Sequence, residues 1–497
     1  MTISIWRYSH LALAFSSAIF IIIASVTGAI LSVEPISEKL NPYRIDGIEN
    51  IYLAETIEVL KQNYEEVLQL KTDYNEFVSI NAITKEGDFV TGYINPLTGK
   101  YLGAEIEKNA FYNYITNLHR SLFLKGIGRF FIGLSSFLLF LIAITGIFLI
   151  IKRQGGSKRI FSKIVYENFR QYYHIVLGRF TLIPILIITL TGVYLSLLRF
   201  DFFEFEEVSS GQKNIIALDR NNVIDSKDFP LFKNTKLVDV KALSFPFSDN
   251  IEDNYTLELK NKEVFINQFT GQEVNTIEFG FNSIIKSLNI NLHTGKGSII
   301  WSIVLFVSCI NILFFVYSGI VMTLARKKNK LKNRFKSDKS KYVVLVGSEN
   351  GNTIAYANAF YNQLIENGEK AHITELNKYR LFKKCEHLVI ITSTYGLGES
   401  PTNGSNFLDL LKSIKQNSNI KYSVVGFGSK AYPDFCKFAI DITKTLKSIN
   451  ITPFIKPFYI DNRSFSLFSE WFNLWSEKAG LDINIKEYEI LNKVTNN

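Results

Sequence analysis

Residues 8–33 read YSHLALAFSSAIFIIIASVTGAILSV, and residues 172–198 read YYHIVLGRFTLIPILIITLTGVYLSLL. Each stretch contains an apolar run long enough to cross the hydrocarbon core of a membrane as a helix, which takes about 20 residues. In each stretch a histidine, His10 or His174, precedes a Thr-Gly pair by 17 residues. The two stretches therefore predict two membrane helices built on one pattern.

A second pattern recurs in the same order. His119 precedes Thr145-Gly146 by 26 residues, and His293 precedes Ser318-Gly319 by 25. Helix, outer loop and helix thus occur twice, at about 1–151 and 164–326, which predicts parallel repeats related by an axis along the membrane normal. One histidine pair should lie at the inner level and the other at the outer level. The four predicted spans are Leu11–Val33, Phe130–Ile151, Ile175–Leu198 and Ile299–Leu324.

The distribution of charge predicts the orientation in the membrane. Lysine and arginine crowd residues 152–171 and 326–340, and short loops of this kind stay cytoplasmic. Both termini are therefore expected in the cytoplasm, and the first span is expected to remain as an uncleaved helix because its apolar run exceeds that of a signal peptide. The net charge of +9 is attributed to this topology and to anionic lipid, so no nucleic-acid partner is expected. No cysteine falls in an outer loop, so no disulfide is expected there.

The outer loops, 34–118 and 201–292, predict two α+β domains. The first has a helical pattern near Leu53–Leu70 followed by strand-like alternation through Tyr101, and the second keeps the strands with a weaker helix. Both contain a similar hairpin, YINPLTGKYLG at 93–103 and FINQFTGQEVN at 265–275.

The four histidines have three interpretations. They could belong to an aromatic belt with Trp6, Tyr8, Tyr172 and Tyr173, or they could bind zinc. Zinc needs four ligands, whereas haem iron already has four equatorial nitrogens and takes two axial histidines. The matched offsets favour two bis-histidine haems, on His10 with His174 and on His119 with His293.

Arg179 lies inside the third predicted span, where an isolated guanidinium is expensive. It could pair with a haem propionate or extend to the inner surface, and the sequence does not decide between these. Arg7, Arg129 and Lys296 are expected to be interface anchors.

Residues beyond the basic linker predict a different domain. The stretches KYVVLVGSENGNT (341–353), HLVIITSTYG (387–396) and YSVVGFGS (422–429) read as buried strands that end in polar, glycine-rich loops, with helical stretches between them. This alternation predicts a doubly wound parallel sheet with a ligand at the carboxyl ends of its strands. The candidate ligand-binding residues are Ser348, Asn350, Gly351, Asn352 and Thr353 in the first loop, Thr392, Ser393, Thr394, Tyr395 and Gly396 in the second, and Gly428, Tyr432 and Phe435 in the third.

Two resemblances add to this reading. The phrases LHRSLFLKGIGRFFIGLSSFLLFLIAITGIFLIIKR, YHIVLGRFTLIPILIITLTGVYLSL and LHTGKGSIIW resemble the PepSY-associated transmembrane helix family, which includes ferrisiderophore reductases. That likeness covers about 1–328 and implies b-type haem and outward electron flow. The three loops resemble the flavodoxin-like FMN domain of diflavin reductases such as the sulfite reductase flavoprotein. This second likeness covers about 341–480 and implies FMN, with its phosphate on the first loop and its ring between the other two.

The predicted protein is an inner-membrane oxidoreductase that passes electrons from FMN through two haems to an outer acceptor. The leading acceptor is a ferric siderophore or another ferric complex, and the alternatives are a quinone, another outer redox protein or an oxidised protein side chain. No nicotinamide-binding module is found after the flavodoxin-like part, so a separate NAD(P)H- or ferredoxin-linked reductase is expected to load the flavin. The alternative is a PepSY-type membrane sensor or protease regulator with a redox-responsive domain. The predicted membrane segments are 1–33, 119–151, 172–200 and 293–325, and the predicted outer domains are 34–118 and 201–292. The basic loop is 152–171, the basic linker is 326–340, the flavodoxin-like domain is 341–480 and the C-terminal tail is 481–497.

Overall fold

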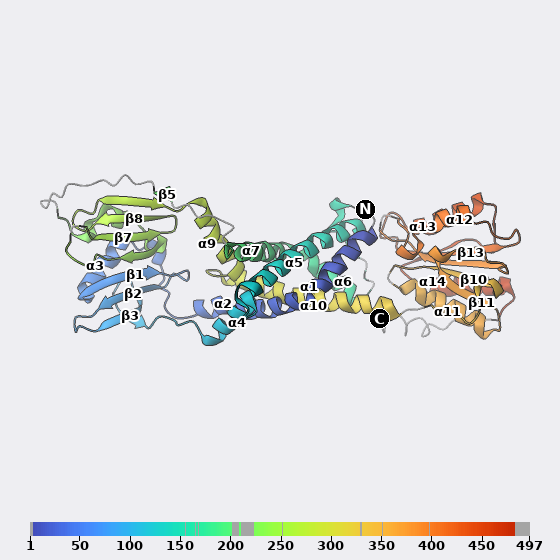
Figure 1. The fold of residues 1–497 in the computed structure, drawn as a ribbon, viewed down its shortest axis with the longest axis horizontal. Helices are drawn as coiled ribbons and strands as arrows, with labels where there is room; N and C mark the ends of the chain where they lie inside the picture. Colours follow the sequence, from blue (N-terminus) through green and yellow to red (C-terminus); the bar gives the residue numbers. More distant parts are fainter. Residues whose placement is uncertain are drawn as a thin grey trace. The chain divides into compact units, whose positions relative to one another are not determined.

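The computed structural model describes residues 3–154, 156–164, 166, 168–200, 208–209, 223–250, 252–328, 331–349, 351–396 and 398–482. The chain divides into two compact units (Figure 1). Unit 1 comprises Met1–Ser16, Leu141–Phe180 and Phe314–Asn497, and unit 2 comprises Ser17–Phe140 and Thr181–Leu313. Each unit therefore combines part of the helical region with one domain that contains a β-sheet.

Three helices among the described residues are long and apolar enough to cross a membrane: α1 (Ile3–Leu31), α5 (Lys125–Gln154) and α10 (Ile299–Lys328). The prediction of an unbroken third span is wrong. The chain there forms α6 (Phe169–Phe180) and α7 (Leu182–Leu198), which meet at a bend of 67° and make a fourth span only if the pair counts as one. Pro184 explains the break, because in a continuous helix its ring would clash with the carbonyl of Phe180.

The two outer loops share one nine-stranded sheet, so the prediction of two separate domains is wrong. The strand order is β4-β3-β2-β1-β6-β7-β8-β9-β5. The halves join where β1 pairs with β6, with Leu70 opposite Leu243 at the antiparallel contact. The strands are β1 (Glu66–Thr72), β2 (Val78–Ile83), β3 (Phe89–Ile94), β4 (Tyr101–Gly103), β5 (Val208–Ser209), β6 (Val240–Ser244), β7 (Asn254–Leu259), β8 (Lys262–Asn267) and β9 (Glu273–Glu278).

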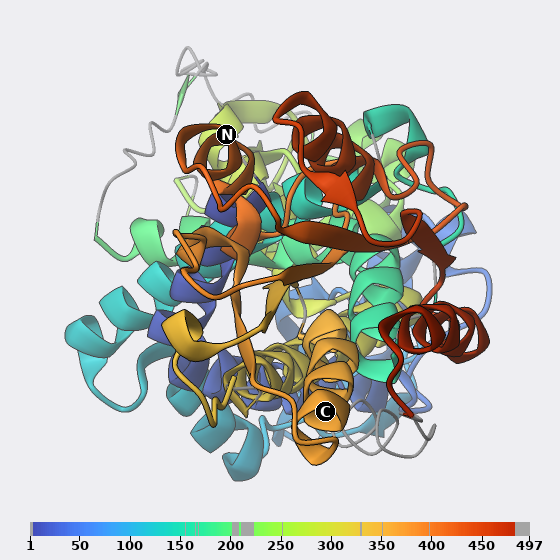
Figure 2. The same cartoon turned by 90° about the vertical axis from the view of Figure 1, so that its right-hand side faces the viewer.

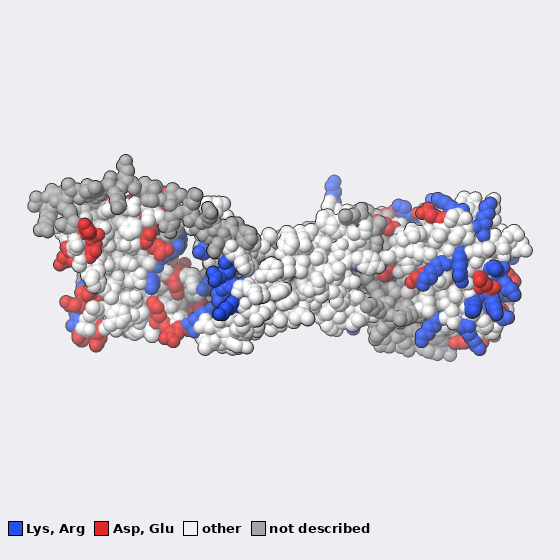
Figure 3. Space-filling model, in the orientation of Figure 1, with Lys and Arg blue, Asp and Glu red and all other residues white. Residues whose placement is uncertain are grey.

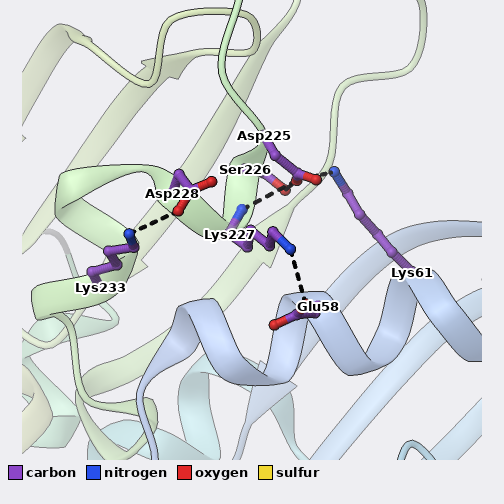
Figure 4. A network of polar contacts seen from close by, with 7 residues as sticks. All are labelled: Glu58, Lys61, Asp225, Ser226, Lys227, Asp228 and Lys233. Atoms are coloured by element: carbon purple, nitrogen blue, oxygen red, sulfur yellow. Dashed lines mark hydrogen bonds and ion pairs between the residues drawn. The ribbon is translucent and has the colours of Figure 1, made fainter.

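Helices α3 (Leu53–Asn63) and α8 (Pro230–Asn234) contribute to the core of this sheet. Helix α3 ends at Asn63, earlier than the predicted helical stretch near Leu53–Leu70, because strand β1 begins at Glu66. A polar network connects the two repeats on the surface, with Lys227 contacting Glu58 at 3.0 Å and Lys61 contacting Asp225 at 3.4 Å (Figure 4). Such exposed ion pairs contribute little to the free energy of unfolding. The shared apolar core therefore holds the halves together.

Three short helices connect the sheet to the long helices. They are α2 (Glu34–Lys39), α4 (Ala110–Ser121) and α9 (Phe281–Thr294). Within the residues that the structure describes, α4 ends at Leu122 in the left-handed conformation, and α9 ends at Gly295 with φ 79°. His119 and His293 therefore lie on short helices of their own, whereas the sequence had assigned them to the starts of the second and fourth spans.

The C-terminal region is a six-stranded parallel sheet with helices on both faces (Figure 2). Alternate residues of its strands enter two cores, one with α11 and α14 and the other with α12 and α13. The strands are β10 (Tyr342–Gly347), β11 (Ala371–Glu375), β12 (His387–Ser393), β13 (Lys421–Gly428), β14 (Thr452–Pro453) and β15 (Phe458–Asp461). The helices are α11 (Asn352–Glu366), α12 (Phe407–Ser413), α13 (Lys437–Ser448) and α14 (Phe465–Ala479). This is the doubly wound parallel sheet that the sequence predicts.

Candidate cofactor sites

The four bundle histidines lie as two facing pairs. His10 on α1 and His174 on α6 belong to unit 1, with ring centroids 6.5 Å apart and an interplanar angle of 72°. His119 on α4 and His293 on α9 belong to unit 2, with centroids 6.2 Å apart and an angle of 50°. Both pairs join one histidine from each sequence repeat.

A serine or threonine hydroxyl holds each ring at Nδ1. Thr27 contacts His119 at 2.7 Å, and Thr191 contacts His293 at 2.9 Å. In the other pair, Thr145 contacts His10 at 2.9 Å and Ser318 contacts His174 at 2.7 Å. These hydroxyls come from the Thr-Gly and Ser-Gly pairs whose spacing repeats in the sequence. The spacing of these pairs is visible in the sequence, but sequence reasoning missed their role as hydrogen-bond partners.

The hydroxyls also determine which ring nitrogen carries the proton. Each one donates its single hydrogen to a carbonyl three or four residues earlier in its own helix; Thr27, for example, donates to Ile23 at 2.7 Å. The hydroxyl oxygen must then accept from the imidazole, so Nδ1 carries the hydrogen. Nε2 is left with its lone pair, which is the form that a metal-binding histidine needs.

The hydrogen bonds and the ring pairs connect different parts of the duplicated bundle. Each hydrogen bond at Nδ1 joins two helices of the same repeat. In the first repeat, α1 contacts α5 through His10 and α4 through Thr27. In the second repeat, α6 contacts α10 and α7 contacts α9. Each pair of facing rings is formed between the repeats. Orientation is therefore set within a repeat, and a shared ligand would bridge the two.

The glycines of these motifs allow the rings to approach. A Cβ placed on Gly192 would lie 3.2 Å from Cε1 of His293, and one on Gly28 or Gly146 would lie 3.5 Å from Cε1 of His119 or His10. Gly319 differs, because nothing lies within 4 Å of its added Cβ. Three of the four motif glycines are thus in contact range of a histidine ring.

The geometry of both pairs fits haem iron. Two metal–nitrogen bonds of about 2 Å on opposite sides of one metal put the ring centroids about 6 Å apart. Within the described residues, no group of three or more His, Cys, Asp and Glu side chains could hold a metal ion, so a metal with two protein ligands suits these sites better than zinc. Burial lowers the pKa of His119 and of His293 to about 4, which keeps these rings neutral and able to coordinate.

A separate cavity of about 110 Å³ opens at the carboxyl ends of the parallel strands. Nine predicted residues line it: Ser348, Asn352, Thr353, Ser393, Thr394, Tyr395, Gly396, Gly428 and Tyr432. Seven others were not predicted: Arg153, Glu349, Phe427, Ser429, Asp434, Asn462 and Arg463. Asn462 and Arg463 follow β15 with positive φ, so a fourth strand-end loop was the signal that sequence reasoning overlooked.

Two side chains in this cavity favour a phosphate-bearing flavin. The hydroxyls of Ser348 and Tyr432 are buried, and no group among the described residues hydrogen-bonds to them. Gly351, with φ 81°, precedes the first turn of α11, where Asn352 and Thr353 begin the helix and backbone amides can bind a phosphate. Tyr395 and Tyr432 are half-buried, and either can stack on a flat ring. The residues present therefore fit FMN.

The remaining predicted residues do not line this cavity. Thr392 is fully buried against Gly347, and Phe435 packs on Gly428. Asn350 lies outside the described residues. Two N–H groups of Arg179 donate to the carbonyl oxygen of Ser162, a residue of the segment 152–171, at 3.0 Å.

Helix α1 contacts the first flavin loop directly. Arg7 forms an ion pair with Glu349 and donates to the hydroxyl of Thr402 at 3.0 Å. Glu349 also accepts from the backbone N–H of Thr402 at 2.7 Å, and its side chain is only 3% exposed. Because Arg7 precedes His10 by three residues, both side chains lie on one face of the helix. The contact thus connects the flavin cavity to the helix that carries His10.

Comparison with known proteins shows the family to which this chain belongs. The model of the PepSY-associated TM region matches residues 7–326, which is more than half of the chain. The chain belongs to the PepSY-associated TM region family. A flavodoxin model matches residues 344–475, so this family member carries a C-terminal flavodoxin domain.

Curated relatives match within the flavodoxin domain. Inducible nitric oxide synthase of Gallus gallus is 33% identical over 124 residues, covering 23% of this chain and 10% of the synthase. The sulfite reductase flavoprotein alpha-component of Vibrio vulnificus is 28% identical over 120 residues, covering 23% of this chain and 20% of that protein. A solved flavodoxin of Streptococcus pneumoniae TIGR4 is 20% identical, with 31% of this chain and 92% of that chain covered and a TM-score of 0.23. The chain thus spans only about a tenth to a fifth of the length of these two curated relatives.

Proposed function

We propose that this protein carries electrons across a membrane, from FMN in the flavodoxin domain to an acceptor on the other side, through two bis-histidine haems. The observation that carries the proposal is the same for both histidine pairs. Each ring is held at Nδ1 by a hydroxyl, and each Nε2 is left free to bind metal at a spacing that suits one iron between two rings. FMN, when bound, can exchange electrons one or two at a time, and an iron with two histidine ligands has no open site for oxygen.

The residues of unit 1 support the inner pair as the entry point. Arg7 holds the loop of Glu349, and Arg153 from the last turn of α5 lines the flavin cavity. Two elements of the helical region thus contact the flavin domain, and α1 also carries His10. We place His10 and His174 first and His119 and His293 second in the order of transfer.

The topology belongs to the same proposal. The basic segments flank the flavodoxin domain and the end of α5, so both termini are placed in the cytoplasm and the protein in the inner membrane. A separate NAD(P)H- or ferredoxin-linked reductase would supply the flavin, and a ferric siderophore or another ferric complex would accept electrons outside. Counting α6 and α7 as one span gives the four crossings that this topology requires.

Visible spectra of the purified protein test the haems. We expect reduced b-type bands in the wild type, with one haem lost in His10→Ala and in His174→Ala, and the other lost in His119→Ala and in His293→Ala. His372→Gln is the matched control, because this histidine lies in the flavodoxin domain and bonds to the carbonyl of Phe335. Spectra unchanged in all four bundle variants would refute the haem assignment.

Reconstitution tests the direction of transfer. Protein is inserted in liposomes with the flavodoxin domain outward, reduced flavin is added outside, and a ferric complex is trapped inside. Ferrous iron in the lumen is the expected result. A protein with both haems and no transfer would favour the sensor or protease regulator instead.

A further inference from the structure

Unit 2 contains a cavity of about 350 Å³ lined by four cationic side chains, Arg120, Lys125, Arg129 and Arg199. Lysine and arginine gather in this part of the molecule, between the sheet and the ends of the long helices (Figure 3). The volume is within the range of small-ligand pockets. Among the residues that the structure describes, no acidic side chain lines the cavity.

Four like charges line this cavity. In the part of the chain that the structure describes, none of them forms an ion pair, and Arg120 donates only to the side-chain oxygen of Asn117 at 3.1 Å. Arg120, Arg129 and Arg199 line the same cavity, and Arg129 is half-buried. Like charges gathered in a pocket repel one another, and a bound anion would remove that cost.

The backbone that shapes the cavity is strained. Leu122, Phe123 and Lys125 all have positive φ, between 50° and 60°, and none is glycine. Non-glycine residues in this conformation are strained, and such residues gather at binding sites. The turn is also tight, because a Cβ on Gly128 would lie 1.7 Å from the carbonyl oxygen of Ser121. This turn carries the cation of Lys125 and sets it across from the end of α4.

The cavity adjoins the outer histidine pair in the chain. Asn117, Arg120 and Ser121 line it, and all three share the last turns of α4 with His119. Outward loops are normally poor in lysine and arginine relative to inward ones, so four cations here are unexpected on the basis of topology alone. A ligand in this cavity would lie beside the group that the proposed function assigns to electron exit.

We propose that this cavity binds a polyanionic, carboxylate-bearing metal chelate, an inference that rests on the proposed function for its placement on the outer side. Three guanidinium groups favour carboxylates, because each can donate two parallel hydrogen bonds to one carboxylate. The cavity thereby selects an anionic chelate over an uncharged one.

Calorimetric titration of the full chain in neutral detergent tests the proposal without electron transfer. The probe is gallium(III) citrate, which is anionic and is not reduced under these conditions. Wild type should bind it, and Arg120→Gln and Arg199→Gln should each weaken binding about 10-fold, because each variant removes a guanidinium that donates charge-assisted hydrogen bonds to a carboxylate. Lys85→Gln, an exposed cation in the turn between β2 and β3, is the matched control and should bind as wild type does.

Three results would overturn the proposal: no binding by wild type, equal binding by the arginine variants and Lys85→Gln, or loss of binding in nanodiscs of anionic lipid, which would assign the cavity to headgroups. The haem spectrum, recorded on each sample, shows that the variants fold and reports on the proposed function separately. Haem bands without chelate binding would overturn only this inference, and chelate binding without haem bands would overturn only the proposed function.

Discussion

At the scale of single residues, four hydroxyls determine what the histidines can bind. A buried imidazole can present either nitrogen, and its rotation is free unless a neighbour fixes it. Thr27, Thr145, Thr191 and Ser318 fix both the tautomer and the orientation, because each hydroxyl has already given its proton to its own helix. The hydroxyls of the Thr-Gly and Ser-Gly pairs therefore orient the histidine rings by hydrogen bonding to Nδ1.

Replacing one hydroxyl should affect only the haem whose histidine it contacts. Thr27→Val conserves volume and removes the acceptor for His119, so we expect about 10-fold weaker retention of the outer haem. Thr145→Val should do the same to the inner haem through His10, even though Thr27 is the residue on the same helix as His10. Haem content and redox titration of the two variants provide the measurement. Loss of the inner haem in Thr27→Val would contradict these assignments.

At the scale of elements, the outer domain depends on a single strand pairing. The first repeat supplies four antiparallel strands (β1–β4) and the second supplies five (β5–β9), and the two halves are joined where β1 and β6 are neighbours. Leu70 and Leu243 are fully buried and opposite each other at this seam. The two halves should therefore unfold together.

Leu70→Ala tests this coupling. Removing a fully buried leucine costs about 3 kcal/mol through lost transfer energy and the cavity that it leaves. We expect faster amide hydrogen exchange in β7 and β8 of the second repeat as well as in β2 and β3 of the first. Lys71→Ala, at the next position of the same strand and exposed, is the control. Faster exchange confined to the first repeat would show that the halves are independent.

At the scale of the whole molecule, Arg7 connects the flavodoxin domain to the helical region. Its partner Glu349 is almost fully buried, so Arg7→Gln leaves an unpaired carboxylate and weakens the contact by about 3 kcal/mol. We expect FMN content to stay normal while the rate of haem reduction by the flavin falls about 10-fold, as measured by stopped-flow spectroscopy. Arg44→Gln, which breaks an exposed ion pair to Glu76 in the outer domain, should leave that rate unchanged. An unchanged rate in Arg7→Gln would show that the contact has no part in transfer.

Much of the architecture follows from local pattern. Apolar runs of membrane length predict helices, and buried strands that alternate with helical stretches predict the flavodoxin sheet. The matched spacing from His10 and His174 to their Thr-Gly pairs reveals the repeat. Each of these signals lies within a few tens of residues, where periodicity and composition determine local structure. Sequence reasoning missed the break at Thr181 even though Pro184, a known helix breaker, is visible in the sequence.

Local sequence pattern was enough to predict three of the long helices, the doubly wound sheet, the duplication and nine residues of the flavin cavity. The pattern did not show that the loops 34–118 and 201–292 share one sheet, that a hydroxyl from each Thr-Gly or Ser-Gly pair contacts a histidine ring, or that Arg7 reaches Glu349. The physical reason is sequence separation. These contacts join residues far apart in the chain, and a local pattern shows which side chains need a partner without showing which partner the fold brings to them.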